Sequence, residues 1–287
     1  MSMHELVMLG IQVSILGTVF SFGLQASLHD ALHLARDRSL LLRSLCSLFV
    51  VMPVVALLIV GVFSLPKPTA IALIALAISP IPPLLPKNES KAGGLPDYGL
   101  GLMLTVGLLA IALVPFEAWL LGRHFNREFD VSAAAVAKPV LTMIVAPLAA
   151  GMLVRIWKPR IASALVRPIL LVATVLLAVC ALALVVTVTP KLLALVGDGT
   201  LWALLLFACI GLLAGHWLGG PIGEDRTVLA LSTASRHPAI ALVIAKGAFP
   251  DESHLAATVA LYLLVVSVTV IPYVRWRRRM PRQGLAK

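Results

Sequence analysis

Arg236 and His237 stand side by side in the stretch LSTASRHPAIALVIA, where they interrupt an otherwise apolar run. A guanidinium group stays protonated and is costly to bury unless a partner satisfies it. Pro238 follows directly, and a proline suits the first position of a helix, whose amino-terminal end carries a partial positive charge. Two positive groups in one place are unfavourable unless an anion joins them. We therefore expect Arg236 and free backbone N–H groups to bind an anion such as a carboxylate.

Both residues also have structural explanations. Arg236 could be a fixed charge paired with Glu89 or Glu224, or it could lie at an interface. His237 titrates near neutral pH and could bind a proton, or it could be a core histidine that only hydrogen-bonds the surrounding chain.

Further polar residues are expected at the same binding site. Lys87 follows Pro86 and would strengthen the anion site or pair with Glu89, although the segment PKNESKAGG could equally be a solvated loop. Small hydroxyl residues could line the site or serve packing between membrane helices. The additional candidates for substrate binding are His237, Ser232, Thr233, Ser235, Lys87 and Asn88.

The elements that must position these residues are membrane helices. Of the 287 residues, 60% are hydrophobic and 13% are charged, whereas soluble domains have about 25% charged residues. A membrane span needs roughly 20 apolar residues, and such runs recur along the whole chain. We predict an all-α polytopic membrane protein with a single domain over residues 1–287. The nine expected spans are 4–28, 38–63, 67–93, 98–122, 132–156, 162–189, 199–219, 223–247 and 252–275.

Two of the nine spans contain residues that break a helix. The third span holds Pro80, Pro82 and Pro83, which remove backbone donors and clash with the preceding turn. Pro238 follows the polar residues of the eighth span. Irregular backbone at membrane depth must be satisfied by protein groups or by water in a cavity, and transporters build binding sites from interrupted helices of this kind. The two breaks therefore predict an internal site.

The distribution of basic residues predicts the orientation. The net charge is +10, and most lysines and arginines gather in alternate loops and in the tail 276–287 without interleaved aromatics. This pattern argues against nucleic acid as a partner and follows the rule that cytoplasmic segments are basic. We expect an integral protein of the bacterial inner (plasma) membrane, with the N-terminus outside and the C-terminus in the cytoplasm.

The run from Phe22 to Leu57 resembles the early part of the bile acid:sodium symporter family. Gly23 and Asp30 precede a basic loop, and an apolar helix with Met52 and Pro53 follows. The resemblance implies an inverted repeat with two discontinuous crossing helices, in which a core domain moves against a panel domain. The first helix of the family is missing here, which leaves four plus five helices: a first repeat over about 1–122 and a second over about 132–275.

The residues that hold sodium in that family are replaced in this chain. The family has Pro-Gly-Gly-Thr-Ala-Ser-Asn in the first crossing and Glu-x-Gly-x-Gln-Asn in the second. A hard cation such as sodium prefers oxygen ligands with negative charge, and the replacing side chains remove the acidic residue and add a cation. The replacing residues are Pro83, Leu85 and Pro86 in the first crossing, Ser232, Ala234, Arg236 and His237 in the second, and Leu48 in place of a glutamine.

The predicted function is transport of small organic anions by alternating access, either secondary active or facilitative. Arg236 would replace the bound cation, so transport would be independent of sodium, and protons could couple it through His237 or Glu89. One alternative is ordinary sodium symport, and another is a membrane sensor or scaffold with a locked crossing. A permanent partner of Arg236 would favour the locked protein, and an open anion-sized cavity would favour transport. The chain has no P-loop, HExxH, CxxC or GxSxG sequence, so we expect neither an enzyme nor a bound cofactor or metal site.

Overall fold

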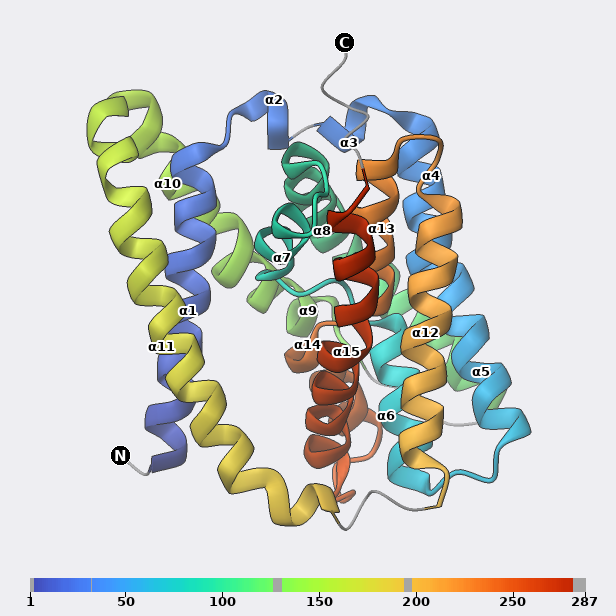
Figure 1. The fold of residues 1–287 in the computed structure, drawn as a ribbon. Helices are drawn as coiled ribbons and strands as arrows, with labels where there is room; N and C mark the ends of the chain where they lie inside the picture. Colours follow the sequence, from blue (N-terminus) through green and yellow to red (C-terminus); the bar gives the residue numbers. More distant parts are fainter. Residues whose placement is uncertain (1–2, 32, 126–130, 194–197, 281–287) are drawn as a thin grey trace.

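The computed structural model of the chain describes residues 3–31, 33–125, 131–193 and 198–280. Helices and turns account for the regular structure of these residues, with no strand among them. Figure 1 shows the helices running mostly along one direction, with α1 starting at the lower end and α15 finishing at the upper end.

Eight helical segments in the described residues are long and apolar enough to cross a membrane. The chain is therefore an integral membrane protein, and the segments agree closely with eight of the nine expected spans. The third expected span consists instead of two short helices, so the count of nine and the inverted repeat stay predictions. The spanning segments are Glu5–Gln25, Arg38–Val62, Pro96–Arg123, Ala133–Trp157, Pro159–Ala183, Thr200–Leu218, Gly223–Ala248 and Leu255–Arg278.

Several of these segments are built from more than one helical element. Two contain a π-helical turn in the middle, and one is interrupted by extended residues. The elements are α1 (Met3–Gln25), α2 (Leu28–Ala31), α3 (His33–Arg36), α4 (Arg38–Cys46), η1 (Ser47–Val51), α5 (Met52–Val62), α6 (Lys67–Ile78), α7 (Leu85–Lys91), α8 (Pro96–Phe125), α9 (Ala133–Val140), η2 (Leu141–Val145), α10 (Ala146–Trp157), α11 (Pro159–Leu193), α12 (Thr200–Leu218), α13 (Gly223–Ala234), α14 (Pro238–Ala248) and α15 (Leu255–Arg278).

The helices form two groups, which Figure 1 shows side by side. The side group, on the left, contains α1, α10 and α11, and α1 packs along both of the others. Glycines bring α1 and α10 into backbone contact, because a Cβ atom on Gly23 would lie only 2.2 Å from the carbonyl oxygen of Leu148. The core group contains α4 to α8 and α12 to α15, and it holds both interrupted spans.

Within the core group, α12 presents glycines to α13. A Cβ atom on Gly215 would lie 2.4 Å from the carbonyl oxygen of Leu229, and one on Gly211 would lie 2.9 Å from the Cα atom of Ala234. Small residues at such spacing let membrane helices approach closely. Their close approach fixes the position of α13 beside α12 and therefore where Arg236 lies.

The broken spans lie at the centre of the core group. All residues of α6 from Ile71 to Ile78 are buried, and so is every residue of α13 except Arg226. Polar groups placed on these helices are consequently shielded from both lipid and water.

Candidate functional site

The site is the place where the two interrupted spans meet. Residues 79–84 separate α6 from α7, and residues 235–237 separate α13 from α14. The backbone N–H of His237 donates a hydrogen bond of 2.8 Å to the carbonyl oxygen of Pro80, so the two breaks are joined directly. Helix α14 also packs against α6, and α13 packs against α7.

Prolines occupy the breaks in the positions that end and begin helices. Pro80, Pro82 and Pro83 all lie between α6 and α7, where no helical hydrogen bond needs their missing donors. Pro238 is the first residue of α14, a position that requires no backbone donor. Local sequence alone accounts for the positions of these breaks.

Arg236 lies inside the crossing and is fully buried, with 0% of its surface exposed. Its Nη1 atom donates to the carbonyl oxygen of Ser79 at 3.1 Å. Its Nη2 atom donates to the carbonyl oxygen of Leu48 at 3.0 Å. The guanidinium therefore bridges α6 and η1 from the end of α13.

Each of these two carbonyl groups lacks a helical donor for a local reason. Ser79 caps the carboxyl end of α6, where carbonyl groups have no intrahelical partner. Leu48 lies in the π-helical turn η1. In a π-helix each carbonyl group accepts a hydrogen bond from the N–H group of the residue five positions later. That residue is Pro53, which has no N–H group. The pairing of a π-turn with Pro53 thus provides an acceptor that Arg236 uses.

The positive side chain of Arg236 consequently contacts the carboxyl end of α6, where the charge of the helix dipole is negative. The carboxyl end of α6 carries partial negative charge, which attracts a cation. The Nε atom of Arg236 is buried without a hydrogen-bond partner. Glu117 of α8 interacts electrostatically with the guanidinium, and no sequence pattern indicates this interaction. Direct binding of a substrate anion by Arg236 stays a prediction.

His237 serves as the N-cap of α14. Its Nδ1 atom accepts a hydrogen bond of 3.4 Å from the backbone N–H of Ile240, and the side chain is 6% exposed. An accepting Nδ1 atom carries no proton, so the imidazole in this arrangement is the neutral form with its proton on Nε2. This is the hydrogen-bonding role that the sequence left open beside a proton role.

The hydroxyl residues of α13 bond to different neighbours. The Ser232 hydroxyl donates to Oε1 of Glu89 at 2.5 Å, and the Thr233 hydroxyl lies 2.8 Å from that of Ser47. Ser235 caps the end of α13 and is only partly buried. The Tyr262 hydroxyl of α15 adds a further bond to the carbonyl oxygen of Ala234, which the sequence pattern did not signal.

Lys87 and Asn88 lie at the start of α7, away from the guanidinium contacts. Lys87 is partly buried and donates to the hydroxyl of Thr174 on α11, so its side chain reaches from the core group to the side group. In the described residues it forms no ion pair with Glu89. Asn88 is exposed.

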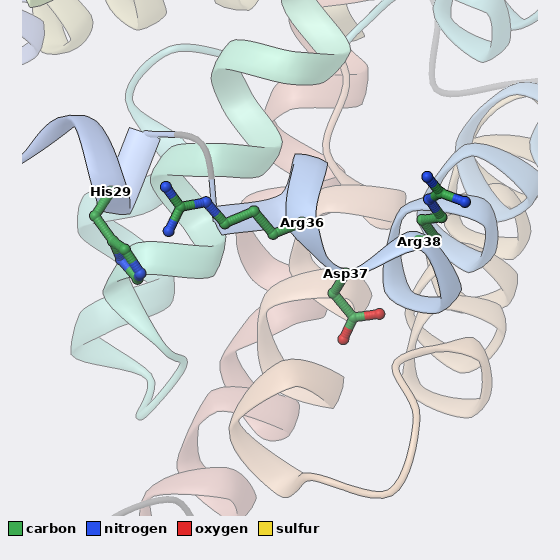
Figure 2. A pocket seen from close by; sticks show the side chains of 4 residues that line it. All are labelled: His29, Arg36, Asp37 and Arg38. Atoms are coloured by element: carbon green, nitrogen blue, oxygen red, sulfur yellow. The ribbon is translucent and has the colours of Figure 1, made fainter.

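A separate hollow lies on the surface near the start of α4. Its volume is about 590 Å³ and it is lined by His29, Arg36, Asp37 and Arg38, which Figure 2 shows around the connection from α2 to α4. None of the predicted site residues lines it.

Asp30, one of the residues that carries the family resemblance, lies close to this surface. Its carboxylate accepts a hydrogen bond of 2.7 Å from the backbone N–H of Ser27, and its own N–H donates to the Ser27 hydroxyl at 3.2 Å. Burial raises the pKa of the Asp30 carboxyl, but the Ser27 hydrogen bonds and the charge of Arg155 lower it by more, so its pKa lies below the ordinary value. Reciprocal bonds of this kind stabilise the start of a helix.

Comparison with known families gives one match. The family model described as "Sodium Bile acid symporter family" matches residues 13–195, which is more than half of the chain. The matched residues include α6 and α7 and stop before α13. No curated protein matches the chain.

Proposed function

The chain belongs to the sodium bile acid symporter family, and from that premise we propose that it carries small organic anions across the membrane by alternating access and without sodium. Members of this family are transporters of the symporter type, which accounts for the absence of recognisable catalytic sequences. The substrate class and the independence from sodium are the parts that rest on this chain's own residues.

The proposal rests mainly on the position of the Arg236 guanidinium. It lies at the crossing and is bonded to the carbonyl oxygens of Ser79 and Leu48. Sodium also binds carbonyl oxygens, and it would have to compete with a resident positive charge for them. A covalently attached cation therefore supplies at all times the charge that symported sodium supplies in other members.

A permanent partner for Arg236 does not by itself lock the protein. Ser79, Leu48 and Arg236 all belong to the core group, so their bonds move with that group. Movement of the core group against the side group would leave them intact. The partners of Arg236 are therefore the kind expected of a locked protein, but they are compatible with a transporter whose core group moves as one body.

Lys87 is the cation best placed to meet a substrate carboxylate between the two groups. It reaches from α7 to Thr174 on α11, and no acidic residue forms an ion pair with it in the described residues. The hydroxyl of Thr174 would be displaced when an anion binds, because an ammonium group bonds more strongly to a carboxylate than to a neutral hydroxyl.

Uptake into proteoliposomes tests the proposal. The full chain is reconstituted, and uptake of a labelled bile acid and a set of smaller labelled carboxylates is measured with sodium and proton gradients imposed separately. We expect uptake that a sodium gradient does not stimulate and that Arg236→Gln abolishes. Lys246→Gln, which removes an exposed lysine of α14, is the matched control and should leave uptake unchanged.

Two results would contradict the proposal in different ways. Stimulation of uptake by a sodium gradient would show that the protein is an ordinary sodium symporter. Failure of the reconstituted, folded protein to carry any of the anions would favour the sensor or scaffold.

A further inference from the structure

Glu89 is a buried carboxyl group without a cation. It lies on α7 with 1% of its surface exposed, although its neighbours Asn88 and Ser90 are both exposed. Its Oε1 atom lies 2.5 Å from the Ser232 hydroxyl, and its Oε2 atom has no hydrogen-bond partner. The Oε2 atom lies against Gly99 of α8, where a Cβ atom would come within 2.5 Å of it.

The charged and titratable groups around Glu89 are otherwise engaged. Arg278 of α15 donates from Nε to the carbonyl oxygen of Lys91, Tyr98 of α8 shares a hydrogen bond with Ser44, and Lys87 bonds to Thr174. None of the described lysines and arginines forms an ion pair with Glu89. Helices α8 and α13 pack against α7, and single hydrogen bonds link α7 to α11 and α15. The described titratable and charged groups on these elements, besides Glu89, are Lys87 and Lys91 on α7, Asp97, Tyr98, Glu117 and Arg123 on α8, Glu224, Asp225 and Arg226 on α13, Arg160, Arg167 and Cys180 on α11, and Tyr262, Tyr273, Arg275, Arg277 and Arg278 on α15.

Keeping the Glu89 carboxyl ionised at this buried position would cost too much free energy. An ionised group that leaves water without a partner loses far more free energy than a neutral one. A neutral Glu89 can carry its proton on Oε2, and Oε1 is then a carbonyl oxygen that still accepts the hydrogen bond from the Ser232 hydroxyl. The burial and the single hydrogen bond therefore favour a protonated carboxyl group.

His237, the other candidate for coupling, is less suited to this task. Its Nδ1 atom accepts the first hydrogen bond of α14 from Ile240, and adding a proton there would break that bond. Glu89 can gain or lose a proton without breaking a helix cap.

We propose that Glu89, with Ser232 as its hydrogen-bonding partner, binds and releases the proton that couples anion transport in this protein; this inference rests on the proposed function. The carboxyl takes up one proton from water on one side of the membrane and becomes neutral in the closed arrangement. Movement of the core group against α11 changes the side of the membrane from which water reaches α7, and the proton returns to water on the other side.

Infrared spectroscopy tests proton binding without a substrate. Spectra of the full chain in proteoliposomes at pH 7 should contain the carbonyl band of a protonated carboxylic acid that is lost in Glu89→Gln. Glu252→Gln is the control, because Glu252 forms an ion pair with Lys67 at 3.5 Å; it should leave the acid band in place. A difference between wild type and Glu89→Gln that contains only carboxylate bands would overturn the inference.

A second variant keeps this test decisive if Glu89→Gln does not fold. Ser232→Ala retains the carboxyl and removes its partner, so the acid band should remain but shift in frequency, since that frequency reports the hydrogen bond. An unshifted spectrum would contradict the assignment of the Glu89–Ser232 pair.

Transport measurements then test coupling. An inward proton gradient should stimulate uptake of the labelled bile acid or carboxylate by the wild type, and Glu89→Gln should lose this stimulation while still exchanging labelled for unlabelled anion. Uptake without any effect of the proton gradient would overturn the coupling role and leave the proposed function standing. Absence of all uptake would contradict both the proposed function and the coupling role. The infrared band would still identify Glu89 as a proton-binding group.

Discussion

At the scale of single residues, the central feature is a cation whose partners are backbone carbonyl groups. Arg236 is among the largest of the fully buried side chains in the described part of the chain, and its guanidinium donates to the carbonyl oxygens of Ser79 and Leu48. The planar guanidinium can reach both carbonyls at once because its donors diverge in a fixed geometry. Lysine offers the same charge at a single point.

Arg236→Lys should therefore destabilise the protein although it conserves charge. Loss of one of the two bonds leaves a buried carbonyl unsatisfied, which costs about 1–3 kcal/mol. The melting temperature of the purified protein in detergent should fall relative to the wild type. Lys246→Arg, the reverse exchange at an exposed position, is the control and should not change it. An Arg236→Lys variant as stable as the wild type would show that the two bonds add nothing to stability.

At the scale of helices, close packing against glycine decides where the polar residues lie. The glycines of α12 let the backbone of α13 approach closely. A shift of α13 along this surface would displace Ser232 from Glu89 and Arg236 from Ser79. The helix contact is therefore part of the functional site even though it carries no chemistry.

Gly215→Ala should reduce stability for this reason. The added Cβ atom would lie 2.4 Å from the carbonyl oxygen of Leu229 and 2.6 Å from the Cα atom of Ala230, so the helices must separate, and overpacking of this kind costs about 1–3 kcal/mol. The thermal unfolding of Gly215→Ala can be compared with that of Gly61→Ala. Gly61 has no atom within 4 Å of the added carbon, so equal effects of the two substitutions would argue against a packing cause.

At the scale of the whole molecule, the proposed transport requires the core group to move relative to the side group. The Lys87–Thr174 hydrogen bond connects the two groups, and neither partner is fully buried. A polar bond between two side chains that water can reach is compatible with movement, whereas the bonds of Arg236, Tyr262 and Thr233 lie within the core group.

Cross-linking across this contact should stop transport. Cysteines are introduced at positions 87 and 174 after Cys46, Cys180 and Cys209 are replaced by serine, and a bifunctional thiol reagent joins them. We expect uptake to fall to background after cross-linking and the melting temperature to stay the same or rise. Because Lys87→Cys itself removes the proposed substrate contact, the measurement compares the same double variant before and after the reagent, with Thr174→Cys alone as the control for labelling. Residual uptake that cross-linking leaves unchanged would contradict movement between the groups.

The sequence by itself determined the membrane class, the boundaries of most spans and the places where two spans break. These properties follow from the length of apolar runs and from the position of proline, and both act locally. Residues such as Pro80 and Pro238 need no information from distant parts of the chain to end or begin a helix.

Only the tertiary structure decided the partners of the polar residues. Arg236 was expected to meet an anion or an acidic side chain, and anion binding stays a prediction. In the structure its guanidinium donates to the carbonyl groups of Ser79 and Leu48, which are 157 and 188 residues away along the chain. Backbone carbonyls have the same chemistry at every residue, so no sequence pattern marks the ones that will be left without a donor until the π-turn, the helix end and the crossing bring them together. Glu89 and Ser232, 143 residues apart, meet for the same reason.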